Sequence, residues 1–235
     1  MDATHNPDFT MMECYAAYWD YETMMRFVER LYREVIQAVF GTLTLSMRGQ
    51  AIDWGKPWPT VDYYEVFERE TGMNLAGATA EALKKKAHDL RLDTTKAIGR
   101  GRLIDLIYKK AVLPKLIEPC FLVDPPVDVE PLAKRLERDP ERVARFQVIA
   151  VGTELGKGFS ELNDPQDQRQ RFEVQMRLRA AGDTEAERLD EDFLEALEYG
   201  MPPAAGFGMS ERLFAILADK PVRETVFFPL MRDSH

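Results

Sequence analysis

The most regular pattern of apolar side chains lies between residues 24 and 41. Apolar residues recur there every three or four positions, which places them along one side of a helix. They are Met24, Met25, Val28, Leu31, Tyr32, Val35, Ile36 and Val39. Gly41 follows them, and glycine commonly ends helices because it tolerates left-handed backbone. The sequence therefore predicts a helix that ends at Gly41, preceded by a strand from Phe9 to Tyr15.

A second pattern, of alternating residues and closely spaced glycines, runs from Phe146 to Pro165. An apolar run of β-branched residues leads into alternation, which predicts two short strands within a sheet. Three glycines lie within seven residues, at positions 152, 156 and 158. Because glycine weakens a strand, this density indicates that some group approaches the backbone closely.

Acidic side chains accompany these glycines. Side chains two apart on a strand share a face, so Glu154 and Gly156 are expected to point the same way. Phe159 and Glu161 are expected to close a small pocket. From spacing alone, a glycine-rich hairpin carrying solvated acids explains the stretch equally well.

The rest of the chain mixes short strand and helix patterns without a βαβ rhythm, and Gly and Pro residues separate the segments. The predicted elements are a hairpin from Thr42–Leu45 and Ala51–Trp54, helices over Tyr63–Glu70, Gln166–Ala181 and Asp190–Tyr199, a buried strand over Pro119–Val123, and a long last helix from a Ser210 cap to Ala218. The segment from Thr79 to Val112 is helical, interrupted at Gly99-Arg100-Gly101. This order predicts an α+β fold, with an antiparallel β-sheet flanked by helices.

Composition and charge narrow the class of protein. The chain has 235 residues, 45% of them hydrophobic, and a formal net charge of −9. These values are ordinary for one globular domain and disfavour nucleic-acid binding through overall charge. No apolar run of about 18 residues would span a bilayer, and the polar first residues lack a signal sequence, so a cytosolic location is expected. Cys14 and Cys120 are expected to be inert core thiols.

One region departs from the acidic balance. Between Lys84 and Lys115 there are ten Lys and Arg residues against three Asp, a local charge of +7. A solvated helical face is one explanation. A patch that meets RNA phosphates is the other, and the sequence leaves both open.

Several stretches together resemble the class II lysyl-tRNA synthetases. FQVIAVGTELGKGFSELNDP, residues 146–165, resembles the segment before motif 3, in which a strand with a metal-binding glutamate leads into a lysine-binding G-x-G-[FY]-S-E-L-N-D core. HNPDFTMME, residues 5–13, resembles the second half of motif 2. DEDFLEALEYGMPPAAG, residues 190–206, resembles the approach to motif 3, and GFGMSER, residues 206–212, resembles motif 3 itself. The similarity runs from His5 to Arg232.

The resemblance implies a fold and an activity. It implies that residues 1–235 form part of a class II synthetase catalytic domain, incomplete at its N-terminus, with a helical insertion at about residues 75–115. The implied reaction is ATP-dependent activation of L-lysine as lysyl-adenylate, followed by transfer to tRNA(Lys). The lysine carboxylate attacks the α-phosphate in line, and Mg²⁺ and arginines stabilise the phosphate charge.

The resemblance also implies a lysine-binding site. Glu161 and Tyr15 match the positions that hold the ε-ammonium of the substrate, and Glu13 matches another acid in that pocket. Phe159 matches the ring that packs on the aliphatic stem. Lys157 stands where the family usually has an asparagine near the substrate carboxylate. A cation there either pairs with that carboxylate or occupies the pocket and repels lysine.

An ATP site is implied in the same way. Phe9 matches the ring that stacks on adenine, with His5 and Met11 as its neighbours. Glu154 matches a glutamate that binds Mg²⁺ between phosphates, since this ion prefers oxygen ligands. Arg212 matches the motif 3 arginine that contacts the γ-phosphate, for which a planar guanidinium is suited.

The departures from the family pattern leave the activity of this chain open. Gln147 stands where many members have a second metal-binding glutamate, which implies a lost or weakened Mg²⁺ site. Motif 3 is one residue shorter than usual. The sequence starts inside motif 2, so the motif 2 arginine, motif 1 with its dimer contacts and the anticodon-binding barrel are not expected, which makes the family's homodimer doubtful here. The alternatives are an inactive fragment, a non-catalytic or regulatory paralogue that binds lysine or nucleotide, and a protein-lysylating relative.

Overall fold

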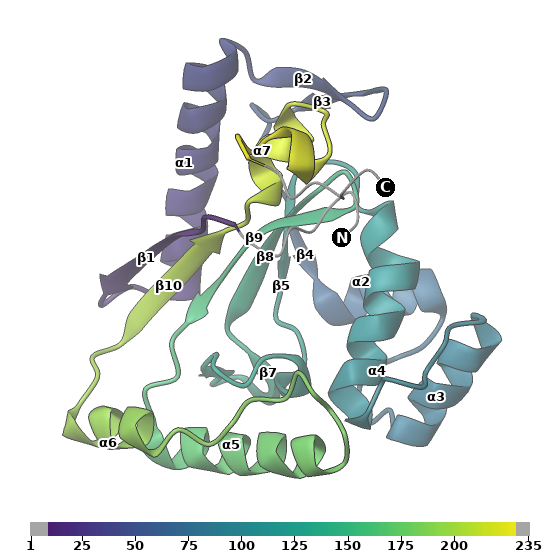
Figure 1. Cartoon of the computed structure of the whole chain (residues 1–235), viewed down its shortest axis with the longest axis vertical. Helices are drawn as coiled ribbons and strands as arrows, with labels where there is room; N and C mark the ends of the chain where they lie inside the picture. The colour runs from purple at the N-terminus through teal and green to yellow at the C-terminus, as the bar shows by residue number, and fades with distance from the viewer. Residues whose placement is uncertain (1–8, 229–235) are drawn as a thin grey trace, which may run out of the picture.

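The computed structural model describes residues 9–228 and is organised around one sheet of six strands. In spatial order these are β1 (Met12–Ala17), β10 (Ala204–Met209), β9 (Thr153–Ser160), β8 (Arg145–Ala150), β5 (Cys120–Val123) and β4 (Thr60–Asp62). All neighbouring pairs are antiparallel except β4 and β5. Helices flank this sheet (Figure 1), which confirms the predicted α+β class.

Helix α1 (Tyr21–Phe40) covers one face of the sheet, called the α1 face below. The Asp20 carboxylate caps the helix by accepting a hydrogen bond from the backbone N–H of Thr23 at 2.7 Å. Gly41 ends it with a φ of 71°. The apolar side of the helix packs on Phe146 and its neighbours to form the main core. The helix predicted from apolar spacing is therefore confirmed.

A second core forms on the other side of the sheet, against β5 and β8. It is built by α2 (Tyr63–Thr71), α3 (Ala80–Asp89), α4 (Gly99–Ile107) and a π-helical turn (Tyr108–Val112), seen at the right of Figure 1. The predicted interruption at Gly99 is wrong, because α4 begins there and the helical path is broken earlier, after α3. Gly101 allows α4 to pack closely on the loop at Asp128, since a Cβ at position 101 would collide with the carbonyl oxygen of Asp128. The helical insertion at about residues 75–115 stays a prediction.

The remaining elements complete the two ends of the molecule. They are the hairpin β2 (Thr44–Met47) and β3 (Gln50–Asp53), the hairpin β6 (Arg135–Leu136) and β7 (Asp139–Val143), helices α5 (Pro165–Ala180), α6 (Glu191–Tyr199) and α7 (Arg212–Leu217), and short 3-10 turns at Leu113–Lys115, Val127–Val129 and Val222–Glu224. The first hairpin and helices α5 and α6 confirm their predictions. Helix α7 has six residues and is not the long helix expected, although the Ser210 hydroxyl accepts from the N–H of Arg212 at 3.2 Å.

Two further sequence expectations concern thiols and membranes. Cys14 is half-buried and Cys120 buried, both as free thiols, and burial raises the pKa of Cys120 to about 12. The Cys120 thiol therefore stays protonated and unreactive at neutral pH. Across residues 9–228, no helix is both long and apolar enough to cross a membrane.

Candidate functional site

A β-bulge decides which side chains of β9 share a face. Val148 pairs with Gly156 but Ile149 pairs with Glu154, so Leu155 is an extra residue on β9. Gln147 lies opposite Lys157 in this register, and its amide donates a hydrogen bond to Glu154. Glu154 therefore lies on the face of Lys157, away from α1. The expectation that Glu154 and Gly156 point the same way is wrong, because an inserted residue reverses the alternation.

The glycines of β9 face α1 and meet aromatic rings. A Cβ on Gly156 would lie 2.7 Å from the Tyr32 hydroxyl and 2.8 Å from the ring of Phe207. A Cβ on Gly158 would lie 2.5 Å from the ring of Phe146. The close approach predicted from glycine density is confirmed, and core aromatic side chains make it.

The opposite face of β1, β10 and β9, called the open face below, has a glycine floor with polar side chains around it. Tyr15 on β1, Gly206 on β10 and Phe159 on β9 lie side by side in register. A Cβ on Gly206 would collide with Oε1 of Glu161 and lie 2.7 Å from the Tyr15 ring, so these two side chains meet over this glycine. The Tyr15 hydroxyl donates to Oε2 of Glu13 at 3.1 Å. We call Glu13, Tyr15 and Glu161 the acid cage.

The acid cage holds uncompensated negative charge. Burial, followed by repulsion from Glu130 and Glu13, raises the pKa of Glu161 to about 7, and Lys157 opposes this shift. Burial, the hydrogen bond to Glu13 and the nearby acids also raise the pKa of Tyr15. A cation entering the cage would relieve this repulsion, so the arrangement favours binding of an ammonium group.

Beside the acid cage lies an ion cluster centred on Glu130. The Glu130 carboxylate is 7% exposed and accepts a hydrogen bond from the Lys157 ammonium at 2.9 Å. The side chain of Arg145 is 8% exposed, and its Nε lies 3.6 Å from the same oxygen. The Lys157 ammonium is 5.9 Å from the centre of the Phe159 ring. Sequence reasoning missed Glu130 and Arg145. The sequence marks them only as charged residues beside proline-rich and apolar stretches, respectively.

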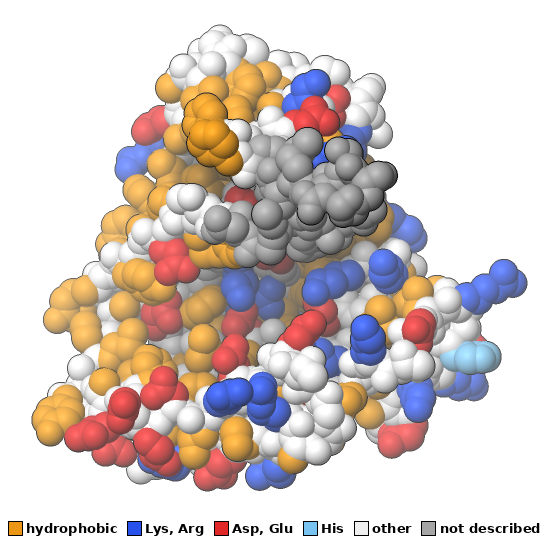
Figure 2. All heavy atoms as spheres, viewed as in Figure 1, with side chains coloured by type: hydrophobic (Ala, Val, Ile, Leu, Met, Phe, Trp, Pro, Cys, Tyr) orange, Lys and Arg blue, Asp and Glu red, His pale blue; other side chains and the backbone are white. Residues whose placement is uncertain are grey.

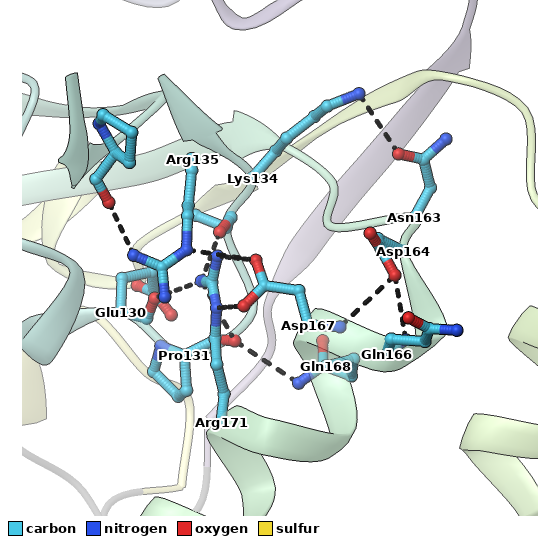
Figure 3. Close-up of polar contacts among 12 residues, drawn as sticks. Glu130, Pro131, Lys134, Arg135, Asn163, Asp164, Gln166, Asp167, Gln168 and Arg171 are labelled. Carbon is cyan, nitrogen blue, oxygen red and sulfur yellow. Dashed lines mark hydrogen bonds and ion pairs between the residues drawn. The ribbon is translucent and has the colours of Figure 1, made fainter. Parts of the chain in front are cut away.

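Helix α5 fixes the loop that carries Glu130 (Figure 3). Arg171 on α5 is 6% exposed, and its guanidinium donates to the carbonyl oxygens of Ala133 at 2.6 Å and Glu130 at 3.4 Å. The Asp167 carboxylate holds Arg171 at 2.7 Å. Gln168 adds a bond to the Pro131 carbonyl at 3.3 Å. The loop is thus tied at several carbonyls, which gives Glu130 a defined position.

The residues predicted to contact phosphates and metal are bonded to residues outside the acid cage. Glu154 is bonded to Gln147. Arg212 donates from Nε to the Ser210 hydroxyl at 3.0 Å and lines a cavity of about 220 Å³ with Arg48 and Thr153. Within residues 9–228, no hydrogen bond or ion pair joins Arg212 to Glu154. In that same span, no three His, Cys, Asp or Glu side chains gather closely enough to hold a metal ion.

The predicted adenine contacts are also divided. Met11 and Glu13 lie over Gly208, since a Cβ there would be 3.6 Å from the Met11 sulfur and 3.8 Å from Cγ of Glu13. Phe9 instead lines an apolar cavity of about 760 Å³ against α1 and α7. Strand β1 begins only at Met12, so Phe9 precedes the strand that was expected to hold it. His5 lies outside the described residues.

In the basic region between Lys84 and Lys115, four of the ten basic side chains are in ion pairs. Arg100 pairs with Asp128, Arg102 with Asp183, Lys109 with Asp105 and Lys115 with Glu70. Lys86 donates to the carbonyl oxygen of Thr71 at 2.8 Å. Lys84 and Lys85 are exposed on α3, the helix at the right of the view, where basic side chains project into solvent (Figure 2). These pairs take up four of the ten basic side chains, three of them with acids from outside the region, so part of the local excess charge is offset within the fold.

Comparisons with known proteins identify the family of the chain. The family described as tRNA synthetases class II (D, K and N) matches residues 1–232. A lysine–tRNA ligase of Moorella thermoacetica is 44% identical over 97% of this chain and 47% of its own length. Lysine–tRNA ligases of Chloroflexus aurantiacus and Roseiflexus castenholzii are 41% and 44% identical over 99% of this chain and 48% of theirs. The chain thus spans about half the length of these relatives.

Proposed function

The chain belongs to the class II tRNA synthetases (D, K and N), and we propose that it binds L-lysine on its open face, binds ATP, and activates the amino acid for transfer to tRNA(Lys). In that reaction a carboxylate oxygen of lysine attacks the α-phosphorus of ATP. The bond to the β-phosphate oxygen breaks, and lysyl-adenylate and pyrophosphate form. The protein contributes by orienting the two substrates and by stabilising charge.

The observation that carries this proposal is the acid cage. Glu161 and Tyr15 meet over Gly206, and Tyr15 is bonded to Glu13, so two carboxylates and a phenol converge where an ε-ammonium would be held. Phe159 lies beside Gly206 in register and offers a ring for the aliphatic stem. A neutral analogue would leave these acids unpaired, which favours lysine over uncharged amino acids.

For ATP, the proposal assigns Arg212 to the γ-phosphate and Phe9, Met11 and His5 to the adenine. It assigns Glu154 to Mg²⁺, which neutralises phosphate charge when bound. One carboxylate beside the Gln147 amide is a partial ligand set. Such a set suits an ion held mostly by substrate phosphates and water.

The partner proposed for the activated lysine is tRNA(Lys). The exposed Lys84 and Lys85 of α3 are the side chains of the basic region that would meet RNA phosphates, because Lys86 is bonded within the fold. Contacts of this kind would position the RNA and would not distinguish one RNA sequence from another.

Lysine binding and pyrophosphate exchange test the proposal separately. We expect the unchanged protein to bind lysine in a calorimetric titration. Glu161→Gln should weaken this binding about thirtyfold, which is the effect of losing a hydrogen bond to a charged group. The control is Glu195→Gln, an exposed acid on α6. Lysine-dependent exchange of pyrophosphate into ATP would support the ligase, and lysine binding without exchange would support a non-catalytic binder. An unchanged protein that binds no lysine would overturn the lysine site.

A further inference from the structure

We propose that Glu130 is a positioning residue for the amino-acid site, which holds the Lys157 ammonium away from the acid cage and toward the place of the substrate carboxylate. This inference rests on the proposed function and deepens it. It assigns a role to a buried carboxylate that the resemblance to lysyl-tRNA synthetases did not bring into the lysine pocket.

The first step concerns the spacing of charges along β9. Lys157 and Glu161 are four residues apart on one face, about 13 Å along a strand, with Phe159 between them. A lysine whose stem lies on Phe159 and whose ammonium lies on Glu161 would direct its carboxylate toward Lys157. Lys157, within β9, and Glu161, just after it, thus offer opposite charges to the two ends of a zwitterion.

The second step concerns competition within the protein. Lys157 ends in a mobile point charge on a flexible stem. Its ammonium lies 5.9 Å from the centre of the Phe159 ring, on the face that leads to Glu161, and its charge lowers the pKa of that carboxyl, so Lys157 can compete for the acid cage. The hydrogen bond to Glu130 at 2.9 Å keeps Lys157 elsewhere. Removing the Glu130 charge would leave Glu161 as the carboxylate toward which Lys157 is drawn.

The third step concerns rigidity. Glu130 is 7% exposed and shared with Arg145, whereas Glu161 is only half-buried. Arg171 ties the loop through the Glu130 and Ala133 carbonyl oxygens (Figure 3). A buried, fixed carboxylate competes better for Lys157 than a half-buried one that is partly protonated. The cluster thus keeps the acid cage available for a substrate ammonium.

The test measures binding of L-lysine and of L-lysinamide, which lacks the carboxylate charge, by calorimetry at pH 8. We expect the unchanged protein to prefer lysine about tenfold, since a charge-assisted hydrogen bond is lost with the amide. In Glu130→Gln, lysine affinity should fall about thirtyfold and the preference should approach one. In Glu130→Gln with Lys157→Asn, lysine affinity should recover to within about fivefold of Lys157→Asn alone.

Recovery of lysine affinity in the double variant would distinguish a positioning role of Glu130 from a purely stabilising one. Asp183→Asn is the matched control, because it removes another buried carboxylate, 6% exposed and paired with Arg102, and should lower the melting temperature without changing lysine affinity. If Glu130→Gln does not fold, Glu130→Asp keeps a charge beside Arg145 while shortening the side chain by about 1.5 Å, and should weaken lysine in the same direction.

The outcomes are distinct. Equal lysine affinity in Glu130→Gln and the unchanged protein, or no recovery in the double variant, would overturn the role of Glu130 and leave the lysine site standing. Failure of the unchanged protein to bind lysine would overturn both proposals.

Discussion

The two faces of strand β9 use glycine and polar groups in opposite ways. Toward α1, Gly156 and Gly158 let aromatic rings reach the backbone, and the Tyr32 hydroxyl is bonded to the Leu155 carbonyl at 2.6 Å. On the open face, Phe159 and Glu161 are half-buried, and Glu161 retains uncompensated repulsion. The side of the strand toward α1 is closely packed and its polar groups are hydrogen-bonded. The other side has acidic groups without a matching cation. We infer that packing against α1 contributes most to stability and that the open face binds lysine.

The largest expected effect is on stability, from Gly158→Ala. The new Cβ would lie 2.5 Å from the Phe146 ring and 2.6 Å from the Gly206 carbonyl oxygen, and neither group can retreat. Overpacking of this kind should lower the free energy of unfolding by about 3 kcal/mol, measured by urea denaturation. Gly49→Ala is the control, because nothing lies within 4 Å and only its left-handed backbone costs about 1 kcal/mol. Equal losses in both variants would contradict the packing argument.

The contrast between the faces explains how far the sequence could predict the fold. Helix α1 was predictable because its apolar spacing, its Asp20 cap and Gly41 agree at the local level. Strand β10 was not assigned, because Ala204–Met209 is short and rich in small residues and is defined by pairing with β1 and β9. Local pattern predicts an element well only where local pattern forms it.

The site was predictable by resemblance and less so by geometry. Alternation assigned Glu154 and Gly156 to one face, but the bulge at Leu155 moves Glu154 to the other, and no local signal marks that inserted residue. Glu130 was missed because its partner Lys157 is 27 residues away and meets it only through the loop tied to α5. Long-range pairings of this kind follow from the whole fold.

The second prediction moves the substitution to the open face. In Gly206→Ala the new Cβ would displace Glu161 and Tyr15, whose side-chain ends can move into solvent. The free energy of unfolding should therefore change by less than about 1 kcal/mol. Lysine affinity should fall about thirtyfold, or about 2 kcal/mol, because the acid cage no longer converges.

Gly208→Ala is the matched control on the same strand and face. Its Cβ would meet Met11 and Glu13 at 3.6 Å or more, which is ordinary contact, so lysine affinity should stay within about twofold of the unchanged protein. A Gly208→Ala variant as weak as Gly206→Ala would mean that any added methyl group disturbs this face. The claim that Gly206 in particular positions the acid cage would then be wrong.

The smallest expected effect is the dependence of lysine affinity on pH. Glu161, with a pKa of about 7, faces Glu130, Glu13, Lys157 and Tyr15, and it attracts an ammonium only when ionised. Lysine affinity should therefore rise about tenfold, or about 1.4 kcal/mol, between pH 6 and 8, whereas Glu161→Gln should show no such rise.

The same carboxyl should move stability in the opposite direction, which separates the two roles of the face. Its folded pKa of about 7 lies above the ordinary value of about 4.3, so the folded state binds the extra proton between these values. The free energy of unfolding should accordingly fall as pH rises through that window, relative to Glu161→Gln. Lysine, by supplying the missing cation, should restore that loss at pH 8. If the free energy of unfolding instead rose with pH relative to Glu161→Gln, groups within the fold would already balance the negative charge of Glu161. The open face would then gain nothing by binding an ammonium group.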